Sequence, residues 1–363
     1  MGNTFRNFVL IALVGLMGCS QETVTPEDTA ARPDPAEMPE IVASSSIICD
    51  LTRQIAAETL DIQCLIGPQQ DPHTYTTKPS DRQALETADL VLYGGYGFET
   101  ALEGLIAAVD TASPKVAVFE QAVSEPIMTE PHDHSHGEEG HSHDHSHGEE
   151  SHSHDHSHAE ESHSHDHSHG EEGHSHDNQK EEMAADPHVW LDVENAIATA
   201  KIIQQQLGNL NPEASDTYTE NTATLIADLE RLDLWIAEQV ATVPENQRIV
   251  MSTHDAFNYF TQAYDFQDSQ ALQGLSTEET PTAAQVKVLV TAIETAKVPA
   301  IFAEANTNNG AIATVAREAN VKVATPALLT GGLGDTANYT DMMVLNTCTI
   351  VNHLGGNCTP PEG

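Results

Sequence analysis

Residues 211–243 read NPEASDTYTENTATLIADLERLDLWIAEQVATV. Asn211-Pro212-Glu213 begins a helical pattern that reaches about Val243. Its apolar residues fall on one stripe, which comprises Leu225, Leu229, Leu232, Trp235, Ile236 and Val240. Roughly thirty residues at about 1.5 Å each span about 45 Å, the width of a domain. A helix of this length can brace two lobes.

Strand and helix patterns alternate on both sides of this helix. Before it, the patterns predict strands at 41–45, 61–66, 90–93 and 115–119, and helices at 51–60, 80–88, 99–109 and 193–207. After it, they predict strands at 248–252, 299–303 and 321–324, and helices at 282–296, 309–319 and 339–354. Such alternation implies parallel sheets covered on both faces.

The predicted fold class is therefore α/β, with two Rossmann-like lobes joined by a long rigid helix. We assign residues 41–210 to the N-terminal lobe, 211–243 to the spanning helix and 244–363 to the C-terminal lobe. The length of 363 residues suits two domains.

The first residues predict export. Arg6 precedes an apolar run over residues 8–16, and Leu16-Met17-Gly18-Cys19 resembles a bacterial lipobox, whose cysteine is lipidated. An uncleaved membrane anchor is the alternative, but the run is too short to span a bilayer as a helix. We read 1–19 as a lipoprotein signal peptide and the proline-rich, acidic residues 20–40 as a tether. The protein is then periplasmic or at the cell surface, anchored by lipid at Cys19.

Four cysteines remain beyond Cys19. An even number in an exported chain indicates disulfides. Of the three possible connectivities, we favour the near pairs, Cys49 with Cys64 and Cys348 with Cys358.

The composition excludes one class of partner. The formal net charge is −42 and aromatic residues make up 5% of the chain. Binding to a phosphate backbone needs clusters of Lys and Arg. We therefore expect no nucleic-acid partner, and a strongly hydrated surface that attracts cations.

A histidine-rich tract interrupts the N-terminal lobe. Seventeen of the 21 histidines lie between His132 and His176, in eleven-residue repeats that begin at His141, His152 and His163. The repeats contain no large apolar residue, so we expect a disordered loop over 132–177. Neutral imidazole is the commonest metal ligand. The alternative is a solvated linker or an expression tag, but a tag would lie at a terminus, whereas this tract interrupts a lobe. The tract therefore indicates handling of transition metals.

Three of the four other histidines follow predicted strands or lie just beyond the tract. They are His73, His188 and His254, and ligands of open α/β sheets bind beyond the carboxyl ends of strands. His73 and His188 each follow Asp-Pro, where proline stiffens the chain. Carboxylates that orient such imidazoles through the second ring nitrogen would come from Asp71, Asp186 or Asp255. The fourth, His353, has no such context and is read as incidental.

At these residues the chain resembles the metal-binding receptors of bacterial ABC importers for zinc and manganese, above all the zinc-uptake (ZnuA-like) branch. The motifs that carry the resemblance, over about residues 41–354, are Asp71-Pro-His-Thr-Tyr, Asp186-Pro-His-Val-Trp-Leu-Asp, Ser252-Thr-His-Asp-Ala-Phe-Asn-Tyr-Phe, Ile301-Phe-Ala-Glu and Tyr339-Thr-Asp-Met-Met. A histidine-rich insertion before the second motif is also typical of the zinc branch.

The resemblance implies two α/β lobes around a rigid helix, with a transported metal ion between them. It implies a receptor, monomeric by our expectation, that delivers Zn²⁺ to a membrane permease, with the His-rich loop as auxiliary capture. Manganese receptors place a carboxylate where this chain has His254, and three imidazoles favour zinc. A manganese or other divalent-metal receptor of the same family is the alternative.

The fourth metal ligand stays open at this point. Many family members supply a late aspartate in a segment that here reads Leu329-Thr-Gly-Gly-Leu-Gly, so Gly331 or Gly332 occupies that place. Water, Glu304, Asp335 or a histidine of the tract would then take the fourth position. Glu304 is equally suited to a structural salt bridge.

Two other functional classes fit parts of the sequence. Three histidines with an open position can in principle activate water, as in a metallohydrolase. The chain has no HExxH, no Gly-x-Ser-x-Gly and no convincing catalytic dyad, so we expect no enzyme. A surface-anchored metal buffer without a transporter is the third class.

Overall fold

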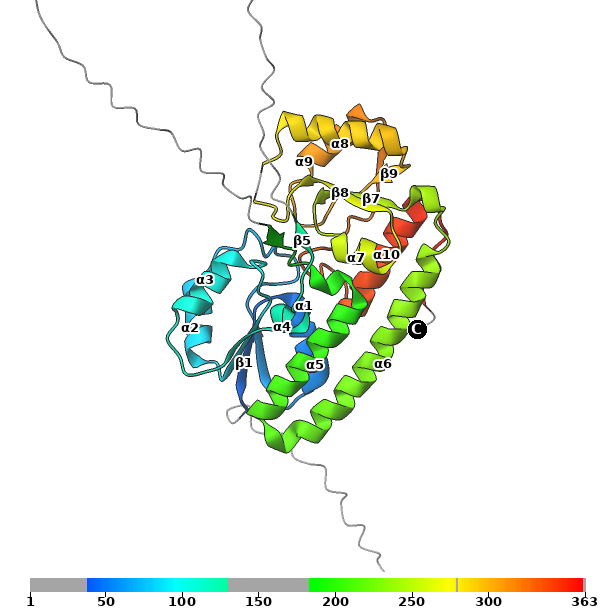
Figure 1. Cartoon of the computed structure of the whole chain (residues 1–363). Coiled ribbons are helices and arrows are strands. Elements are labelled where there is room, and N and C mark those ends of the chain that lie inside the picture. The colour runs from blue at the N-terminus through cyan, green and yellow to red at the C-terminus, as the bar shows by residue number, and fades with distance from the viewer. Residues whose placement is uncertain (1–37, 130–182, 279, 362–363) are drawn as a thin grey trace, which may run out of the picture.

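The computed structural model describes residues 38–129, 183–278 and 280–361. The first lobe is built on a four-stranded parallel sheet in the order β2-β1-β3-β4 (Figure 1). The strands are β1 (Glu40–Ala43), β2 (Asp61–Cys64), β3 (Leu90–Tyr93) and β4 (Lys115–Ala117).

Helices cover both faces of this sheet because its central strands bury side chains on both sides. Val42 and Val91 pack against α2 (Pro79–Thr87) and α3 (Thr100–Ala108). Ile41 and Leu92 point to the opposite face, toward α1 (Ser46–Ala56), α4 (Val118–Ala122) and α5 (Val193–Leu210). This alternation along a strand is what a sheet covered twice requires.

The second lobe repeats the arrangement on a smaller scale. Its parallel strands form the pairs β7 (Ile249–His254) with β8 (Asp268–Gln273) and β9 (Ala300–Ile301) with β10 (Lys322–Val323). A backbone bridge between Ser252 and Phe302 connects the two pairs. The helices that follow α6 (Ser215–Val240) are α7 (Asn258–Ala263), α8 (Ala283–Ala296), α9 (Gly310–Glu318) and α10 (Tyr339–His353), and α10 packs against α6 and α1. Both lobes are thus α/β with parallel sheets, as predicted.

The long helix α6 (Ser215–Val240) runs along the side of the molecule toward the second lobe (Figure 1). A short 3-10 turn (Pro212–Ala214) precedes it, so the predicted helix start is slightly early. Its buried stripe comprises Tyr218, Thr222, Leu225, Leu229, Leu232, Ile236 and Val240. All of these side chains except Thr222 belong to one core that also contains Ile41 of the first lobe and Phe302 of the second. The helix therefore ties the lobes into a common core.

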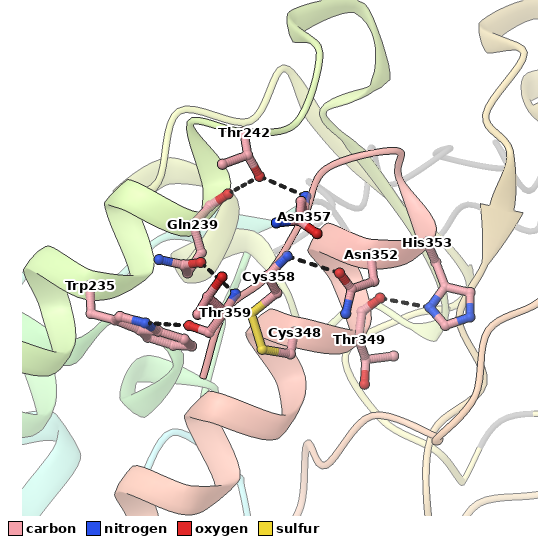
Figure 2. Close-up of a disulfide and its surroundings, with 10 residues drawn as sticks. All are labelled: Trp235, Gln239, Thr242, Cys348, Thr349, Asn352, His353, Asn357, Cys358 and Thr359. Carbon is pink, nitrogen blue, oxygen red and sulfur yellow. Dashed lines mark hydrogen bonds between the residues drawn. A yellow bond between two sulfur atoms is a disulfide. The ribbon is translucent and has the colours of Figure 1, made fainter. Parts of the chain in front are cut away.

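The cysteines form the near pairs favoured from the sequence. Cys49–Cys64 links α1 to β2, and Cys348–Cys358 links α10 to the chain beyond it. Figure 2 shows how the second disulfide holds this terminal segment across α6. The Trp235 indole donates to the Thr359 carbonyl at 3.0 Å, and the Thr359 amide donates to the Gln239 side chain at 2.9 Å.

Several elements differ from prediction. Helix α1 begins at Ser46 rather than Leu51, because the Ser45 side chain accepts from the Ile48 amide and caps it. The sequence patterns missed α7, β8 and the antiparallel pair β5 (Met128–Thr129) and β6 (Ala184–Ala185). These missed strands are very short or only partly buried, so they lack a clear hydrophobic period.

Within residues 38–129, 183–278 and 280–361, no helix is long and apolar enough to cross a membrane. The lipobox cysteine Cys19 and the histidines of the tract lie outside the described residues.

Candidate metal centre

His73 lies in the loop that follows β2. The Asp71 carboxylate accepts a hydrogen bond from the His73 backbone amide at 3.0 Å, which closes a tight turn around Pro72. This turn fixes the ring at the edge of the first lobe, where it is buried. Asp71 therefore orients the backbone of His73 and not its second ring nitrogen.

His188 is held by a similar Asp-Pro-His turn. Asp186 Oδ1 accepts from the His188 amide at 2.9 Å and lies 2.8 Å from His188 Nδ1. Nδ1 donates to this carboxylate, so Nε2 keeps a free lone pair. Asn258 and Tyr259 of the second lobe also contact Asp186, through its carboxylate and its carbonyl respectively. The predicted role of Asp186 as the orienting carboxylate of His188 agrees with this geometry.

His254 is the last residue of β7 and comes from the second lobe. Its backbone amide donates to Glu304 Oε1 at 2.9 Å, and its ring Nδ1 faces Glu304 Oε2. The Thr330 hydroxyl donates to the same Oε2 at 2.9 Å. Glu304, and not Asp255, is therefore the carboxylate that orients His254.

The three rings converge on one point between the lobes. His188 Nε2 lies 3.2 Å from His73 Nε2 and 3.1 Å from His254 Nε2. All three side chains are buried, and among the described residues they form the one group of three or more potential ligands close enough to share an ion. The three histidines singled out in the sequence are thus brought together.

The surroundings favour neutral rings at two of these positions. Burial, followed by the neighbouring histidines, holds the pKa of His73 and of His188 well below its usual range. Burial acts the same way on His254, but the Glu304 carboxylate outweighs it and raises the pKa of His254. A metal ion therefore competes with protons mainly at His254.

The other proposed fourth ligands occupy different places. Both carboxylate oxygens of Glu304 already contact His254 or Thr330, so Glu304 orients the His254 ring and is not directed at the metal position. Asp335 is exposed and accepts from the Gln69 side chain. A Cβ at Gly331 would lie 2.8 Å from the Pro72 ring, and one at Gly332 would lie 2.9 Å from the Pro68 carbonyl. A larger residue at either position would require the Pro72 ring or the Pro68 backbone to shift, and the two glycines themselves offer no side-chain ligand.

His353 is structural, in keeping with its incidental reading. Its Nδ1 donates to the Thr349 carbonyl at 2.9 Å within α10 (Figure 2). The residues missed from the sequence were Asn258, Tyr259 and Thr330, which support the imidazoles through Asp186 and Glu304. Asn258 and Tyr259 stand in the Ser252 motif, but only the folded chain shows what they contact.

Two α/β lobes with a buried three-imidazole cluster between them define a two-lobed metal receptor. Residues 41–353 match the family described as zinc-uptake complex component A, periplasmic. The chain belongs to this family, whose members are extracytoplasmic metal-binding receptors of ABC importers and not enzymes.

Individual relatives agree with this assignment. The manganese-binding lipoprotein MntA of Halalkalibacterium halodurans is 29% identical over 351 residues, 95% of this chain and 96% of that protein. The manganese ABC transporter substrate-binding lipoprotein scaA of Streptococcus gordonii is 26% identical over 355 residues, which is 96% of this chain and 98% of that protein.

Solved structures show the same architecture. The periplasmic zinc-binding protein TroA of Treponema pallidum superposes with a TM-score of 0.70 at 25% identity, over 88% of this chain and 99% of that one. Fe(III)-bound YtgA of Chlamydia trachomatis shares the fold with a TM-score of 0.69 at 20% identity, over 89% and 100%.

Proposed function

We propose that this receptor binds Zn²⁺ with high affinity at His73, His188 and His254 and delivers it to the permease of an ABC importer. The observation that carries the proposal is the ligand set, three buried imidazoles with both carboxylate neighbours directed at Nδ1 atoms. Imidazole suits zinc, whereas manganese prefers carboxylate, carbonyl and water oxygens.

The origin of the ligands supports a role in transport. His73 and His188 come from the first lobe and His254 from the second, so all three ligands reach a bound ion only while the two lobes keep this relative position. Separating the lobes would remove one of three ligands and weaken binding sharply. A permease that holds the lobes apart would thus collect the ion.

In this proposal, Cys19 anchors the receptor at the membrane and the His-rich tract captures zinc. Cys19 would carry the lipid that holds the receptor at the membrane, in line with the lipoprotein names of its relatives. The tract over 132–177 would collect zinc as an auxiliary loop. Its attachment points, Thr129 and Ala184, are paired as neighbouring strands, and Ala184 lies four residues before His188.

The alternative cargo is manganese, which is named for MntA and scaA. Competition decides between them: the purified mature chain is loaded with equimolar Zn²⁺ and Mn²⁺ against a chelator of known affinity. Zinc bound at one tight equivalent, with manganese excluded, supports the proposal. Preferential binding of manganese would overturn it. Deleting the gene distinguishes the receptor from a metal buffer without a transporter. Loss of a receptor should impair growth at low zinc, whereas loss of a buffer should not.

A further inference from the structure

Two buried polar side chains of α10 contact loops of both lobes. The helix begins with the motif Tyr339-Thr-Asp-Met-Met and packs against α6 and against α1 of the first lobe. Tyr339 and Asn346 are fully buried. They are seven residues apart, about two helical turns, and therefore project from the same face of the helix. Their polar groups are directed at the backbone of two different loops, one in each lobe.

Tyr339 holds the turn that carries His188. Its hydroxyl donates to the Trp190 carbonyl at 2.6 Å. Trp190 lies in the 3-10 turn Val189–Leu191, which begins directly after His188. The Leu191 amide donates to the His188 carbonyl at 3.2 Å, so His188 and Trp190 belong to one hydrogen-bonded turn. The tyrosine therefore fixes the backbone from which the His188 ring projects.

Asn346 holds a loop of the second lobe in a similar way. Its side-chain oxygen accepts from the Leu329 amide at 2.8 Å, and its side-chain nitrogen donates to the Leu329 carbonyl at 2.8 Å. The next residue, Thr330, donates to Glu304, the carboxylate that faces the His254 ring. Asn346 therefore supports His254 through a chain of contacts.

Both ends of α10 are fixed to other helices. At its start, the Tyr339 amide donates to the Asp50 carboxylate of α1 at 2.8 Å. Toward its other end, the Cys348–Cys358 disulfide holds the terminal segment, which is hydrogen-bonded to α6 (Figure 2). Side chains on a rigid helix hold their partners more precisely than side chains on a loop. The position of α10 is thus passed on to both loops.

We propose that Tyr339 and Asn346 are positioning residues for the metal site, and that α10 sets the placement of the ligands from the two lobes. This inference rests on the three-histidine site proposed above and concerns residues that do not touch the ion. Tyr339 keeps His188 in place, and Asn346 keeps His254 in place. Because a preformed site has less ordering left to do when it binds, the loss of either contact weakens binding.

Tyr339→Phe and Asn346→Ala are the test variants. Tyr339→Phe keeps the buried ring and removes the hydroxyl alone, so it carries the test even if Asn346→Ala does not fold. The matched control is Tyr218→Phe, because the Tyr218 side chain is also buried on a helix and its hydroxyl contacts Thr59 at 2.8 Å, near the start of α6. We expect the zinc dissociation constant to rise about 10-fold in each test variant, as for other groups that support metal ligands, and to change by less than about 2-fold in the control. Chelator competition with the mature chain measures these constants.

The absorption spectrum of the chain loaded with one equivalent of Co²⁺ provides a readout that a purely structural role would not move. The d–d bands of cobalt depend on the geometry of its ligands, so we expect them to shift in Tyr339→Phe and to stay unchanged in Tyr218→Phe.

The outcomes separate this inference from the function on which it rests. Wild-type affinity in either folded test variant, or an equal loss of affinity in Tyr339→Phe and Tyr218→Phe, would overturn the inference alone, provided that the wild type binds zinc tightly. Failure of the wild-type chain to bind zinc tightly would instead overturn the proposed function.

Discussion

His188 and His254 come from opposite lobes, yet their Nε2 atoms lie 3.1 Å apart. His73 Nε2 lies 3.2 Å from His188 Nε2, nearly as close. The three ring nitrogens therefore surround one point. Because Asp186 and Glu304 face the Nδ1 atoms of the first two rings, their Nε2 lone pairs point inward. The two lobes therefore present a preformed set of potential metal ligands.

Glu304 is expected to control affinity without touching the metal ion. In Glu304→Gln, one amide group replaces a carboxylate that accepts from the His254 amide, the His254 ring and Thr330. An amide nitrogen facing Nδ1 would favour the wrong tautomer, with the proton on Nε2. We expect zinc affinity to fall by about 10- to 100-fold in a chelator competition assay. Asp335→Asn, at an exposed position away from the imidazoles, should leave the affinity unchanged.

Glu99 should make stability depend on pH. It is fully buried, and burial raises its pKa from 4.5 to about 7. The folded chain therefore holds this proton more strongly than the unfolded chain. The contribution to stability is full below about pH 4.5, declines as pH rises and is lost above about pH 7, a change of about 3 kcal/mol.

Glu99→Gln should remove this dependence. The glutamine oxygen can still accept from the Gly94 amide, which donates to Glu99 Oε1 at 2.7 Å. We expect the variant to gain stability over the wild type at pH 8 and to gain little or none at pH 5. Urea denaturation at the two pH values measures the difference. An equal effect at both would show that the carboxyl group has an ordinary pKa.

The second disulfide should stabilise the terminal segment of the chain. Cys348 and Cys358 are 10 residues apart, and closing a loop of this length contributes about 3 kcal/mol in the chain-entropy model. We expect the double replacement by serine to lower the free energy of unfolding by up to that amount. Hydrogen exchange should rise at the amides of Asn357 and Thr359, which bond to Thr242 and Gln239. Unchanged protection there would mean that the hydrogen bonds suffice.

The His-rich tract should bind several zinc ions weakly, since each must order a flexible segment. Deleting residues 131–177 should remove this weak stoichiometry and leave the tight site nearly unchanged. Tract zinc should be released as pH falls through about 6.5, because protonated imidazole cannot bind metal. Isothermal titration of the deletion variant and the wild type distinguishes the two phases. Loss of the tight phase would show that the tract supplies an essential ligand.

The sequence alone predicted the two lobes, the spanning helix and the three imidazoles. Long periodic segments such as 215–240 are readable because one face must be buried along many turns. His73, His188 and His254 were found because each stands in a short motif that places it after a strand or a tight turn.

The supporting contacts were less predictable because they join distant segments. Glu304 lies 50 residues from His254. Its orienting role depends on the backbone bridge between Ser252 of β7 and Phe302, two residues before Glu304. Asp71 was one of three carboxylates considered for an imidazole nitrogen, but its side chain accepts from the His73 amide and from Thr277. Tertiary packing determines these hydrogen-bond partners, and a local sequence pattern carries no information about it.

Replacement of His254 tests the central claim most directly, because this residue is the one imidazole from the second lobe and the position at which a carboxylate would favour manganese. Zinc binding to the wild type and to His254→Ala is measured by competitive titration of the mature chain, with His353→Ala as the control. The three-histidine site predicts one tight zinc in the wild type and the control, and loss of the tight phase in His254→Ala. Tight binding of wild-type strength in His254→Ala would contradict it.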